Sequence, residues 1–365
     1  MKLGDFQPRL EQWLAAKAGW RENVGRFCTG WFKEGLGARS ITRDITWGIP
    51  VPLAEAKGKV LYVWFDAPIG YLSFTQELFA ARGEPEGWKR YWADPECALV
   101  HFIGKDNIVF HAIVWPAMLM GHGGLNLPAN VVANEFLNVR GQKSSKSRNW
   151  AVWVDEYLAA FPPDPLRYYL TANAPEGRDA DFSWEDFQSR NNTELAAVLG
   201  NFVHRTLAFI EKYLGGVAPA RGALGESERA VLAEAELAVT EVAGELEGFR
   251  FKAGLQRLMK LAKSANQYFD AAAPWKTRKT DPPACATAIS VCLALVDRLA
   301  ALMYPFMPGS AAKIEGFLGR EEKALPRQWS ALGDGPAAGA RLNKPEPLFR
   351  QIEDEEVAAA NAKLG

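Results

Sequence analysis

Apolar positions in the first half of the chain follow two patterns, one typical of helices and one typical of buried strands. In residues 8–36 they recur at helical spacing and predict a helical region with one buried face. Three short, nearly continuous apolar runs predict strands at 60–65, 98–103 and 130–133. A helical pattern over 108–120 lies between the second and third runs. Helices that alternate with such strands predict an α/β fold on a parallel sheet covered on both faces.

The second half of the chain has almost no period-two alternation and predicts an all-α bundle, with the change of pattern near residue 175. Ser183 predicts the N-cap of a long helix that ends near Tyr213, before two glycines. Further helices are predicted at 227–246, 250–271, 284–304 and 309–318, and a short one in the charged, Ala-rich segment after 342.

Composition places the chain among globular proteins. It has 365 residues, enough for two or three domains, with 48% hydrophobic and 23% charged residues, which excludes a disordered or fibrous protein. Lys plus Arg is 42 and Asp plus Glu is 43, which excludes a protein held to nucleic acid by bulk charge. A local basic patch is compatible with this balance.

The cysteines and histidines predict a reducing compartment and no zinc site. The four cysteines form no C-x-x-C pair, and the four histidines add no zinc-ligand spacing. The N-terminus lacks the apolar core of a signal peptide, and no apolar run approaches the roughly 18 residues of a membrane span. We therefore expect a cytoplasmic protein without a membrane partner.

Residues 140–149 place four cations and three hydroxyl groups in one loop, between a predicted strand and a predicted helix. Lysine side chains, hydroxyl groups and backbone N–H groups suit a polyanion. The loop lacks the Walker A spacing, which disfavours a P-loop nucleoside triphosphatase. From composition alone, a solvated basic turn is the favoured interpretation.

Two segments at the ends of predicted strands carry residues suited to a small-molecule site. Gly104 permits close approach of a ligand and Asp106 can accept hydrogen bonds from ribose, where open α/β sheets bind ligands. Trp64, Ala67 and Tyr71 can line an apolar pocket at the end of the first run. A capped strand turn explains the first segment equally well, and core packing is the stronger explanation of a single aromatic in the second.

In the helical half, Asn201 and Arg205 share a helix face, and Trp275 follows a proline beside three cations. An exposed Trp can stack on an unpaired base whose edge Asn and Arg can hydrogen-bond. Without context, a buried Trp and a surface ion pair are the favoured interpretation.

Taken in order along the chain, these segments resemble the methionyl-tRNA synthetase family of class I aminoacyl-tRNA synthetases. The resemblance is carried by Arg43-Asp44, Trp47–Pro52, Tyr62–Tyr71, His101–Asp106, Phe110-His111, Trp115–Met118, Lys143–Ser147, Leu166–Leu170, Asn201–Arg205, Ala273–Trp275, Leu348-Phe349 and Ile352-Glu353. Lys143–Ser147 is similar to the KMSKS signature, which alone indicates only class I. The match covers nearly the whole chain, and its motifs keep one order.

The resemblance implies a role for each matching position. The methionine pocket is expected to comprise Trp64, Ala67, Pro68, Tyr71, His111 and Trp115. The ATP site is expected to comprise Gly104, Asp106, Lys143, Ser145 and Lys146, with Lys143 and Lys146 as catalytic residues around the triphosphate. The CAU anticodon is expected to be read by Asn201, Arg205 and Trp275. ATP and Mg²⁺ are the implied cofactors, no residue is assigned to a metal, and methionine and tRNA(Met) are the implied partners.

Three departures separate this sequence from the family pattern. Ser144 replaces the usual Met of the lysine loop, and Asn107 stands where an aliphatic residue is usual. The His-Ile-Gly-His motif and the inserted connective domain are absent, so the sequence matches the family from just after that insertion. We expect the matching N-terminal half to come from a second polypeptide or from the rest of a longer gene product.

The sequence therefore predicts three segments. Residues 1–140 form the C-terminal half of a Rossmann-like catalytic domain, 141–175 the lysine loop and a connection, and 176–365 a helical anticodon-binding domain. The favoured function is ATP-dependent activation of methionine and its transfer to tRNA(Met). A non-catalytic tRNA-binding module is the alternative. A class I synthetase for leucine or valine is disfavoured, because those enzymes need an editing insertion.

Overall fold

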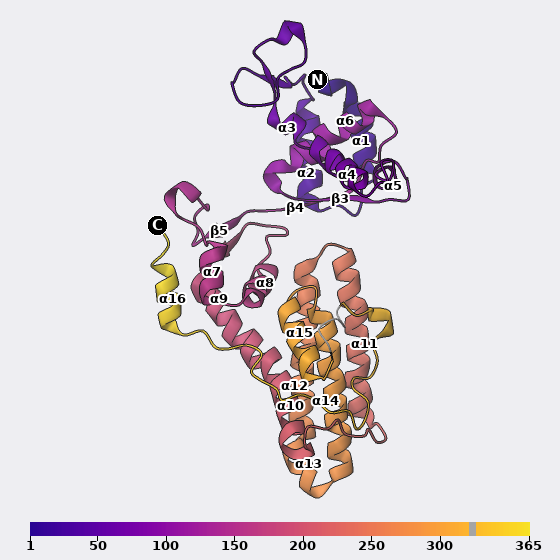
Figure 1. The fold of residues 1–365 in the computed structure, drawn as a ribbon, viewed down its shortest axis with the longest axis vertical. Helices are drawn as coiled ribbons and strands as arrows, with labels where there is room; N and C mark the ends of the chain where they lie inside the picture. Colours follow the sequence, from indigo (N-terminus) through magenta and orange to yellow (C-terminus); the bar gives the residue numbers. More distant parts are fainter. Residues whose placement is uncertain (321–325) are drawn as a thin grey trace. The chain divides into compact units, whose positions relative to one another are not determined.

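The computed structural model describes residues 1–320 and 326–365, which form two compact units (Figure 1). The first unit comprises residues 1–136 and 175–179, and the second comprises 137–174 and 180–365. The three functional segments expected from the sequence, with limits at 140 and 175, stay a prediction.

The first unit surrounds a short parallel sheet with helices. Its strands are β1 (Thr42–Arg43), β2 (Val60–Leu61), β3 (Leu99–Gly104) and β4 (Pro128–Asn134). Its α-helices are α1 (Gln7–Ala15), α2 (Glu22–Glu34), α3 (Val63–Asp66), α4 (Ile69–Ala81), α5 (Lys89–Trp92) and α6 (Trp115–His122). Shorter turns are η1 (Leu3–Phe6), η2 (Ala54–Ala56), η3 (Lys105–Asn107) and the π-helical η4 (Phe110–Val114).

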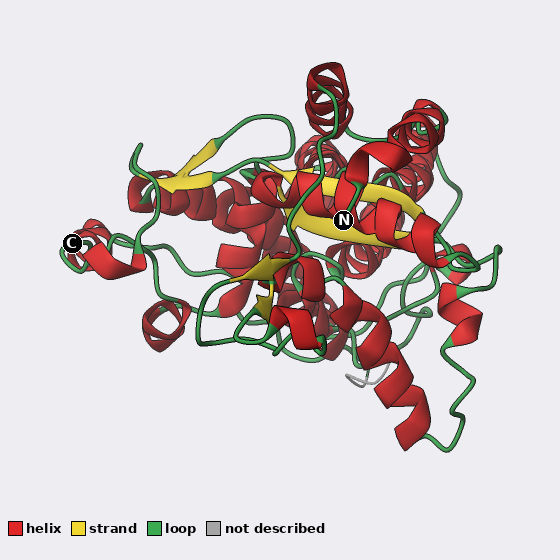
Figure 2. Ribbon diagram, turned by 90° about the horizontal axis from the view of Figure 1, so that it is seen from above, coloured by secondary structure: helices red, strands yellow, loops and turns green. Residues whose placement is uncertain are grey.

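The parallel pair β3–β4 confirms the second and third predicted strands and the α/β class of this half (Figure 2). Phe102 pairs with Val132 and Gly104 with Asn134, so the carboxyl ends of the two strands lie together. Val131 and Ala133 are buried against α2 and η4 in the main core of the unit. The chain between the strands returns through η3, η4 and α6, because parallel strands cannot be joined by a tight turn.

The prediction of a strand over 60–65 is wrong beyond Leu61. The carbonyl of Tyr62 accepts hydrogen bonds from the amides of Phe65 and Asp66, so the backbone turns into α3. The remaining strand, β2, pairs antiparallel with β1 and lies outside the parallel sheet. A six-residue apolar run fits a strand or a helical turn, and the local hydrogen bonds decide here.

The second unit contains a small parallel sheet and a helical bundle. Its strands are β5 (Leu137–Val139) and β6 (Ala180–Phe182). Its α-helices are α7 (Val154–Ala160), α8 (Pro163–Ala172), α9 (Trp184–Arg190), α10 (Asn201–Leu214), α11 (Glu226–Glu247), α12 (Phe251–Ala272), α13 (Pro274–Thr280), α14 (Pro282–Met303), α15 (Pro308–Phe317) and α16 (Asp354–Asn361). The π-helical η6 (Asn191–Gly200) joins α9 to α10, and η5 (Lys146–Arg148) and η8 (Trp329–Ala331) are 3₁₀ turns.

The bundle confirms the helices predicted for the second half. Ser183 accepts a hydrogen bond from the Asp186 amide as the N-cap of α9, and Gly215 ends α10 in the left-handed conformation (φ 64°). In Figure 1, α10, α11, α12, α14 and α15 lie together in the bundle, and α16 lies alongside α7 and α9.

Helix α14 corrects the expectation that no apolar run approaches membrane-spanning length. Within the described residues it is the one helix long and apolar enough to cross a membrane, but 89% of its apolar window is buried in the structure. Asp297 and Arg298 interrupt the run in the sequence, and both are buried. Such burial is typical of a core helix.

Two buried carboxylates, one on α14 and one on α15, form ion pairs with Arg320 and Arg327. Asp297 and Glu315 are 1% and 0% exposed, and both pair with Arg320 and Arg327. The distance between Arg327 Nη1 and Asp297 Oδ1 is 2.8 Å. Removing one partner leaves charged groups without compensation in a poorly solvated site.

We predict that Asp297→Ala lowers the free energy of unfolding of the second unit by about 3 kcal/mol. Urea unfolding followed by far-UV circular dichroism measures it. The control is Asp334→Ala, because Asp334 pairs with Arg221 at the surface with 75% of its side chain exposed. That change should cost less than about 1 kcal/mol, and equal losses for the two variants would contradict the prediction.

Candidate functional site

An aromatic cluster stands at the end of β3 in the first unit. Trp64 of α3 stacks on Phe110 of η4, with ring centroids 5.1 Å apart and an interplanar angle of 19°. Tyr71 of α4 and His111 of η4 form a hydrogen bond of 2.9 Å between the hydroxyl and Nε2. The fold thus brings Tyr71 and His111, which sequence reasoning placed in one pocket, into contact, and it sets Trp64 against Phe110, the neighbour of His111.

The direction of the Tyr71–His111 hydrogen bond follows from the surroundings of the imidazole. His111 Nδ1 lies 3.1 Å from the carbonyl of Asn107, which only accepts, so Nδ1 carries the proton. Burial lowers the pKa of His111, and the side chain is therefore neutral near pH 7. Nε2 is then an acceptor, and the Tyr71 hydroxyl donates to it. The oxygen of Tyr71 keeps acceptor capacity toward a ligand.

His101 of β3 completes this cluster and has a lowered pKa. Its ring lies 5.3 Å from Tyr71 and 5.1 Å from His111, measured between centroids. Burial, and then the neighbouring His111, lower the pKa of His101 to about 4. The site therefore presents neutral imidazoles and aromatic rings, a surface that suits an apolar or polarisable side chain.

Gly104 and Asp106 stand together where β3 ends. A Cβ at position 104 would lie only 2.7 Å from Asp106 Oδ1, so the position of this carboxylate depends on the glycine. Lys105 points into a separate cluster, where its Nζ lies 2.8 Å from Glu135 and 2.7 Å from Asp179. The Asp106 carboxylate is exposed and available to a hydroxyl-bearing ligand.

The other residues expected in the methionine pocket differ in exposure. Ala67 is exposed at the end of α3, and Pro68 is buried at the start of α4. Trp115 is 3% exposed and packs edge-to-face on Trp92 in a separate core cluster. Asn107 meets the cluster through its backbone carbonyl, which any residue type would supply.

A cavity of about 660 Å³ lies beside α3 in the same unit. Its walls include Arg43, Trp47, Tyr62 and Asp66, and Arg43 stacks on the Tyr62 ring at 3.7 Å. Trp47 is 78% exposed, which makes this wall an apolar surface open to solvent.

The lysine loop belongs to the second unit. Lys143 and Lys146 are exposed, and Ser145 pairs with Trp150 through two backbone hydrogen bonds of 2.9 Å. Arg140 (φ 48°) and Asn149 (φ 53°), the two ends of the loop, have left-handed backbones. The loop is a closed turn that presents two ammonium groups.

The three residues expected at the anticodon lie on one surface of the second unit. Arg205 of α10 stands over the rings of Phe269 (4.4 Å) and Trp275 (5.9 Å) and pairs with Asp270 at 2.7 Å. Asn201 reaches Asn266 of α12 at 3.4 Å, one turn before Arg205 along α10. Trp275 is 42% exposed, enough to offer a ring face.

Sequence reasoning missed several contributors to these sites. It named Phe110 only as part of a motif, whereas the ring forms one side of the Trp64 stack. It gave no role to His101, Phe269 or Asp270, although each contacts a residue that it did select. Helical spacing between Asp270 and Asn266 could have indicated their shared face.

The described residues hold no group of three or more His, Cys, Asp or Glu side chains placed to bind a metal ion. The expectation that Mg²⁺ binds with ATP names no protein ligand and stays a prediction.

Two family models show the class of protein to which the chain belongs. A family model described as "tRNA synthetases class I (M)" matches residues 1–207, and one described as "Anticodon binding domain of methionyl tRNA ligase" matches residues 218–365. The parallel α/β half, the lysine loop and the helical bundle are thus parts of a class I aminoacyl-tRNA synthetase. The chain belongs to the methionyl-tRNA synthetase family.

Individual relatives agree with this assignment. The methionine–tRNA ligase of Thermococcus kodakarensis is 46% identical over 98% of this chain, and that of Bacteroides fragilis is 48% identical over 100%. These alignments cover 49% and 53% of the relatives, so the chain spans about half their length. The Mycobacterium tuberculosis methionyl-tRNA synthetase in complex with methionyl-adenylate superposes with a TM-score of 0.85 and 32% identity, over 95% of this chain and 67% of that one.

We predict that His101 makes the first unit less stable in acid. The folded pKa, about 4, lies below the unfolded value near 6.5, so the unfolded state binds the proton more readily. Stability is therefore retained above pH 6.5 and falls by up to about 3 kcal/mol as the pH drops to 4. Urea unfolding followed by tryptophan fluorescence at pH 7 and pH 4.5 measures the loss.

The variant His101→Gln should show a smaller loss between the two pH values, because glutamine does not titrate. His122→Gln is the control, since His122 is exposed. An identical pH dependence in the unmodified chain and in His101→Gln would contradict the assignment.

Proposed function

We propose that this chain forms the part of a methionine–tRNA ligase that contributes the methionine side of the active site, the lysine loop and the anticodon-binding domain. The reaction is ATP-dependent formation of methionyl-adenylate followed by transfer of methionine to tRNA(Met). The proposal extends to this chain the name of its relatives and the adenylate bound by the M. tuberculosis enzyme.

The observation that carries the proposal is the neutral cluster of Tyr71, His101 and His111, with the Trp64–Phe110 stack next to it in sequence and Gly104 and Asp106 at the end of β3. A thioether makes favourable contacts with aromatic rings, and a neutral imidazole loses less hydration free energy than a charged one when an apolar side chain covers it. Ala67, Pro68 and Trp115 are the other residues proposed to shape the methionine pocket. Asp106 is proposed to accept hydrogen bonds from the ribose of ATP.

Lys143 and Lys146, with Ser145 beside them, are proposed to engage the triphosphate. The carboxylate of methionine attacks the α-phosphorus, the bond to the bridging oxygen breaks, and pyrophosphate leaves. Negative charge grows on the phosphoryl oxygens during this step, so a cation held nearby stabilises the transition state more than the bound substrates.

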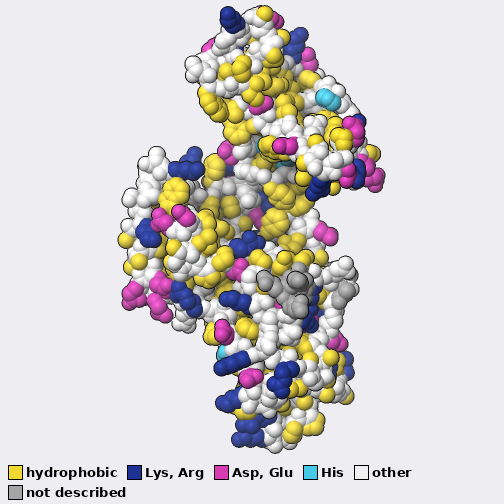
Figure 3. Space-filling view, viewed as in Figure 1, with side chains coloured by type: hydrophobic (Ala, Val, Ile, Leu, Met, Phe, Trp, Pro, Cys, Tyr) yellow, Lys and Arg dark blue, Asp and Glu magenta, His cyan; other side chains and the backbone are white. Residues whose placement is uncertain are grey.

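The edge of β3 that faces away from β4 supports the proposal that an N-terminal half completes the first unit. Side chains cover the far edge of β4, because Trp20 donates to the carbonyl of Ala129 and Arg21 and Asn23 donate to that of Ala133. Among the described residues no strand pairs with the other edge of β3. Figure 3 shows apolar side chains on the visible face of this unit, and Phe74 is 70% exposed. We propose that strands of the N-terminal half extend the sheet here.

The direct test mixes the purified chain with an N-terminal half of a related methionine–tRNA ligase. ATP–pyrophosphate exchange that depends on methionine and on both halves is the expected result. Absence of exchange with every N-terminal half that folds would contradict the catalytic proposal.

The second unit supports the tRNA part of the function. Asn201 and Arg205 are proposed to hydrogen-bond anticodon bases, and Trp275 is proposed to stack on one. Lys and Arg side chains gather near this end of the bundle in Figure 3, and Lys276 and Lys279 of α13 are exposed. These cations suit the phosphates of an anticodon stem.

The alternative is a non-catalytic tRNA-binding module. The geometry around Arg205 supports this alternative, because the contacts of Arg205 with Phe269, Asp270 and Trp275 all lie within the second unit and need no residue of the first. This alternative predicts anticodon-dependent binding of tRNA(Met) with no exchange activity in any mixture. For either function we propose a cytoplasmic location, which agrees with four cysteines that form no disulfide.

We predict that Lys146→Ala reduces adenylate formation in the assembled enzyme by about a hundredfold, because one transition-state cation is lost. The affinity for methionine should change little, since the aromatic cluster is untouched. ATP–pyrophosphate exchange measures the rate, and methionine titration measures the affinity. Lys344→Ala, a change of an exposed lysine elsewhere, is the matched control. An equal loss of methionine affinity would show that the loop has a different role.

We predict that Trp275→Ala weakens binding of the CAU anticodon stem-loop by about tenfold, the effect of one lost base–aromatic contact. Exchange of pyrophosphate should be unaffected. Binding of stem-loops with CAU and with an altered anticodon measures the discrimination. A variant that discriminates as well as the unmodified chain would refute the role of Trp275.

A further inference from the structure

The lysine loop is held at both ends by one distant segment. Arg140 precedes the two lysines and Asn149 follows them, and both have left-handed backbones. Residues other than glycine pay free energy for this conformation, so surrounding contacts must maintain it. Backbone hydrogen bonds of Arg140 to Phe182 and of Gly365 to Asn149 contribute to this. Both ends are also contacted by residues 361–363, which end or directly follow α16.

Asn361 makes the first contact. Its Oδ1 accepts a hydrogen bond of 2.9 Å from Arg140 Nη1, and its Nδ2 donates to Glu185 Oε1 at 2.9 Å. Arg140 also pairs with Glu185 at 3.8 Å. The amide of Asn361 therefore completes a three-membered polar cluster around the first end of the loop.

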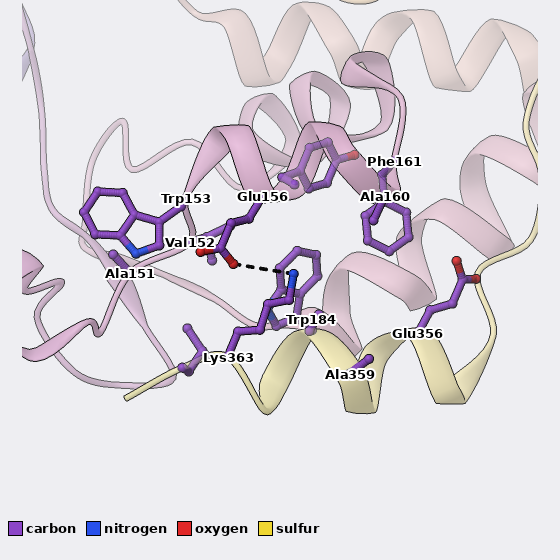
Figure 4. Close-up of a pocket in the computed structure, with 13 residues that line it drawn as sticks. Ala151, Val152, Trp153, Glu156, Ala160, Phe161, Trp184, Glu356, Ala359 and Lys363 are labelled. Carbon is purple, nitrogen blue, oxygen red and sulfur yellow. Dashed lines mark ion pairs between the residues drawn. The ribbon is translucent and has the colours of Figure 1, made fainter.

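Lys363 makes the second contact. Its backbone carbonyl accepts a hydrogen bond of 3.1 Å from Asn149 Nδ2, while Asn149 Oδ1 accepts from Trp153 Nε1 at 2.8 Å. The ammonium group of Lys363 pairs with Glu156 of α7 at 3.5 Å (Figure 4). The second end of the loop is thus tied to α7 and to the same C-terminal segment.

Apolar packing alone does not fix this segment. A cavity of about 170 Å³ lies between α7 and α16, lined by Trp153, Tyr157 and Trp184 among others (Figure 4). Val357 anchors α16 in the core, and Ala360 and Leu364 pack partly buried against it, but residues 361–363 are only half-buried or exposed. Polar contacts therefore set the direction of the Asn361 side chain and of the Lys363 carbonyl, which are the groups that reach the loop ends.

We propose that residues 361–363 form a brace that keeps the lysine loop in the conformation needed to receive the triphosphate, with Asn361 and Asn149 as positioning residues. The assignment rests on the proposed function of Lys143 and Lys146. A loop ordered before the nucleotide arrives loses less conformational entropy on binding. The brace should therefore affect the affinity for ATP and leave the affinity for methionine, which depends on residues of the first unit, unchanged.

The first test uses this chain alone and needs no activity. Trypsin cuts after Lys143, Lys146 and Arg148, which are all exposed, and mass spectrometry maps the cuts. Asn361→Ala should raise the cleavage rate in the loop about tenfold, the effect of losing a hydrogen bond to a charged group. Asn149→Asp, which keeps the acceptor for Trp153 but loses the donor to Lys363, should raise it similarly.

Two variants serve as controls for this cleavage. Glu355→Ala changes an exposed side chain of α16 and should leave the rate unchanged. The double variant Asn361→Asp with Glu185→Gln keeps an acceptor for Arg140 and reverses the hydrogen bond between positions 361 and 185, so its rate should stay within about twofold of the unmodified chain. A loop that is cut no faster in Asn361→Ala than in Glu355→Ala would overturn the brace.

The second test asks whether the brace positions the lysine loop for ATP or only holds the C-terminal segment in place. In the assembled enzyme, Asn361→Ala should raise KM for ATP about tenfold and leave KM for methionine unchanged. The double variant Asn361→Asp with Glu185→Gln should restore the value for ATP. Faster cleavage with an unchanged KM for ATP would overturn the positioning role. If the unmodified chain supports no exchange, the proposed function fails, and the cleavage result still decides whether the brace exists.

Discussion

The parallel pairing of β3 with β4 is the constraint on which the first unit depends. Parallel strands need a long crossover, and here that crossover supplies η3, η4 and α6, which carry Asp106, Phe110 and His111. The pairing of Gly104 with Asn134 sets the two strand ends side by side. Lys105 can then bind Glu135, the residue directly after β4. The site residues are placed by this register rather than by local sequence preference.

The two candidate sites differ in how firmly they are held. Around His111 the contacts are buried, and burial keeps the imidazoles neutral as well as fixed. Around Lys143 and Lys146 the contacts are exposed hydrogen bonds between segments far apart in sequence. Exposed polar contacts contribute less free energy than buried packing. Rigidity suits the side-chain recognition proposed for the cluster around His111, whereas contacts that can open suit the polyphosphate binding proposed for the lysine loop.

Much of the secondary structure follows from local sequence, and most of the site geometry does not. Residues 98–103 and 130–133 are β-rich apolar runs bounded by polar residues, and both are strands. The run at 60–65 has the same composition, yet it turns into α3, because hydrogen bonds to Tyr62 compete with strand pairing. Tyr71 and His111 are separated by 40 positions and Arg205 and Asp270 by 65, so only the fold brings them into contact. The family resemblance indicated the candidate site residues, but no pattern in the sequence predicted that Trp64 stacks on Phe110.

Methionine activation and tRNA binding, the two proposed activities, place different demands on the chain, because their residues lie in different units. The hydrogen bond, ion pair and ring contacts of the proposed anticodon residues, which are Asn201, Arg205 and Trp275, lie within the second unit. The core of that unit includes 40 buried hydrophobic residues in one cluster. The aromatic cluster around Tyr71 belongs to a unit whose β3 edge has no strand partner among the described residues and whose surface exposes Trp47 and Phe74. Parallel strands are rarely stable at the edge of an uncovered sheet. In the proposed function, binding of an N-terminal half would therefore stabilise the proposed methionine pocket directly, while the contacts proposed for tRNA are complete without it.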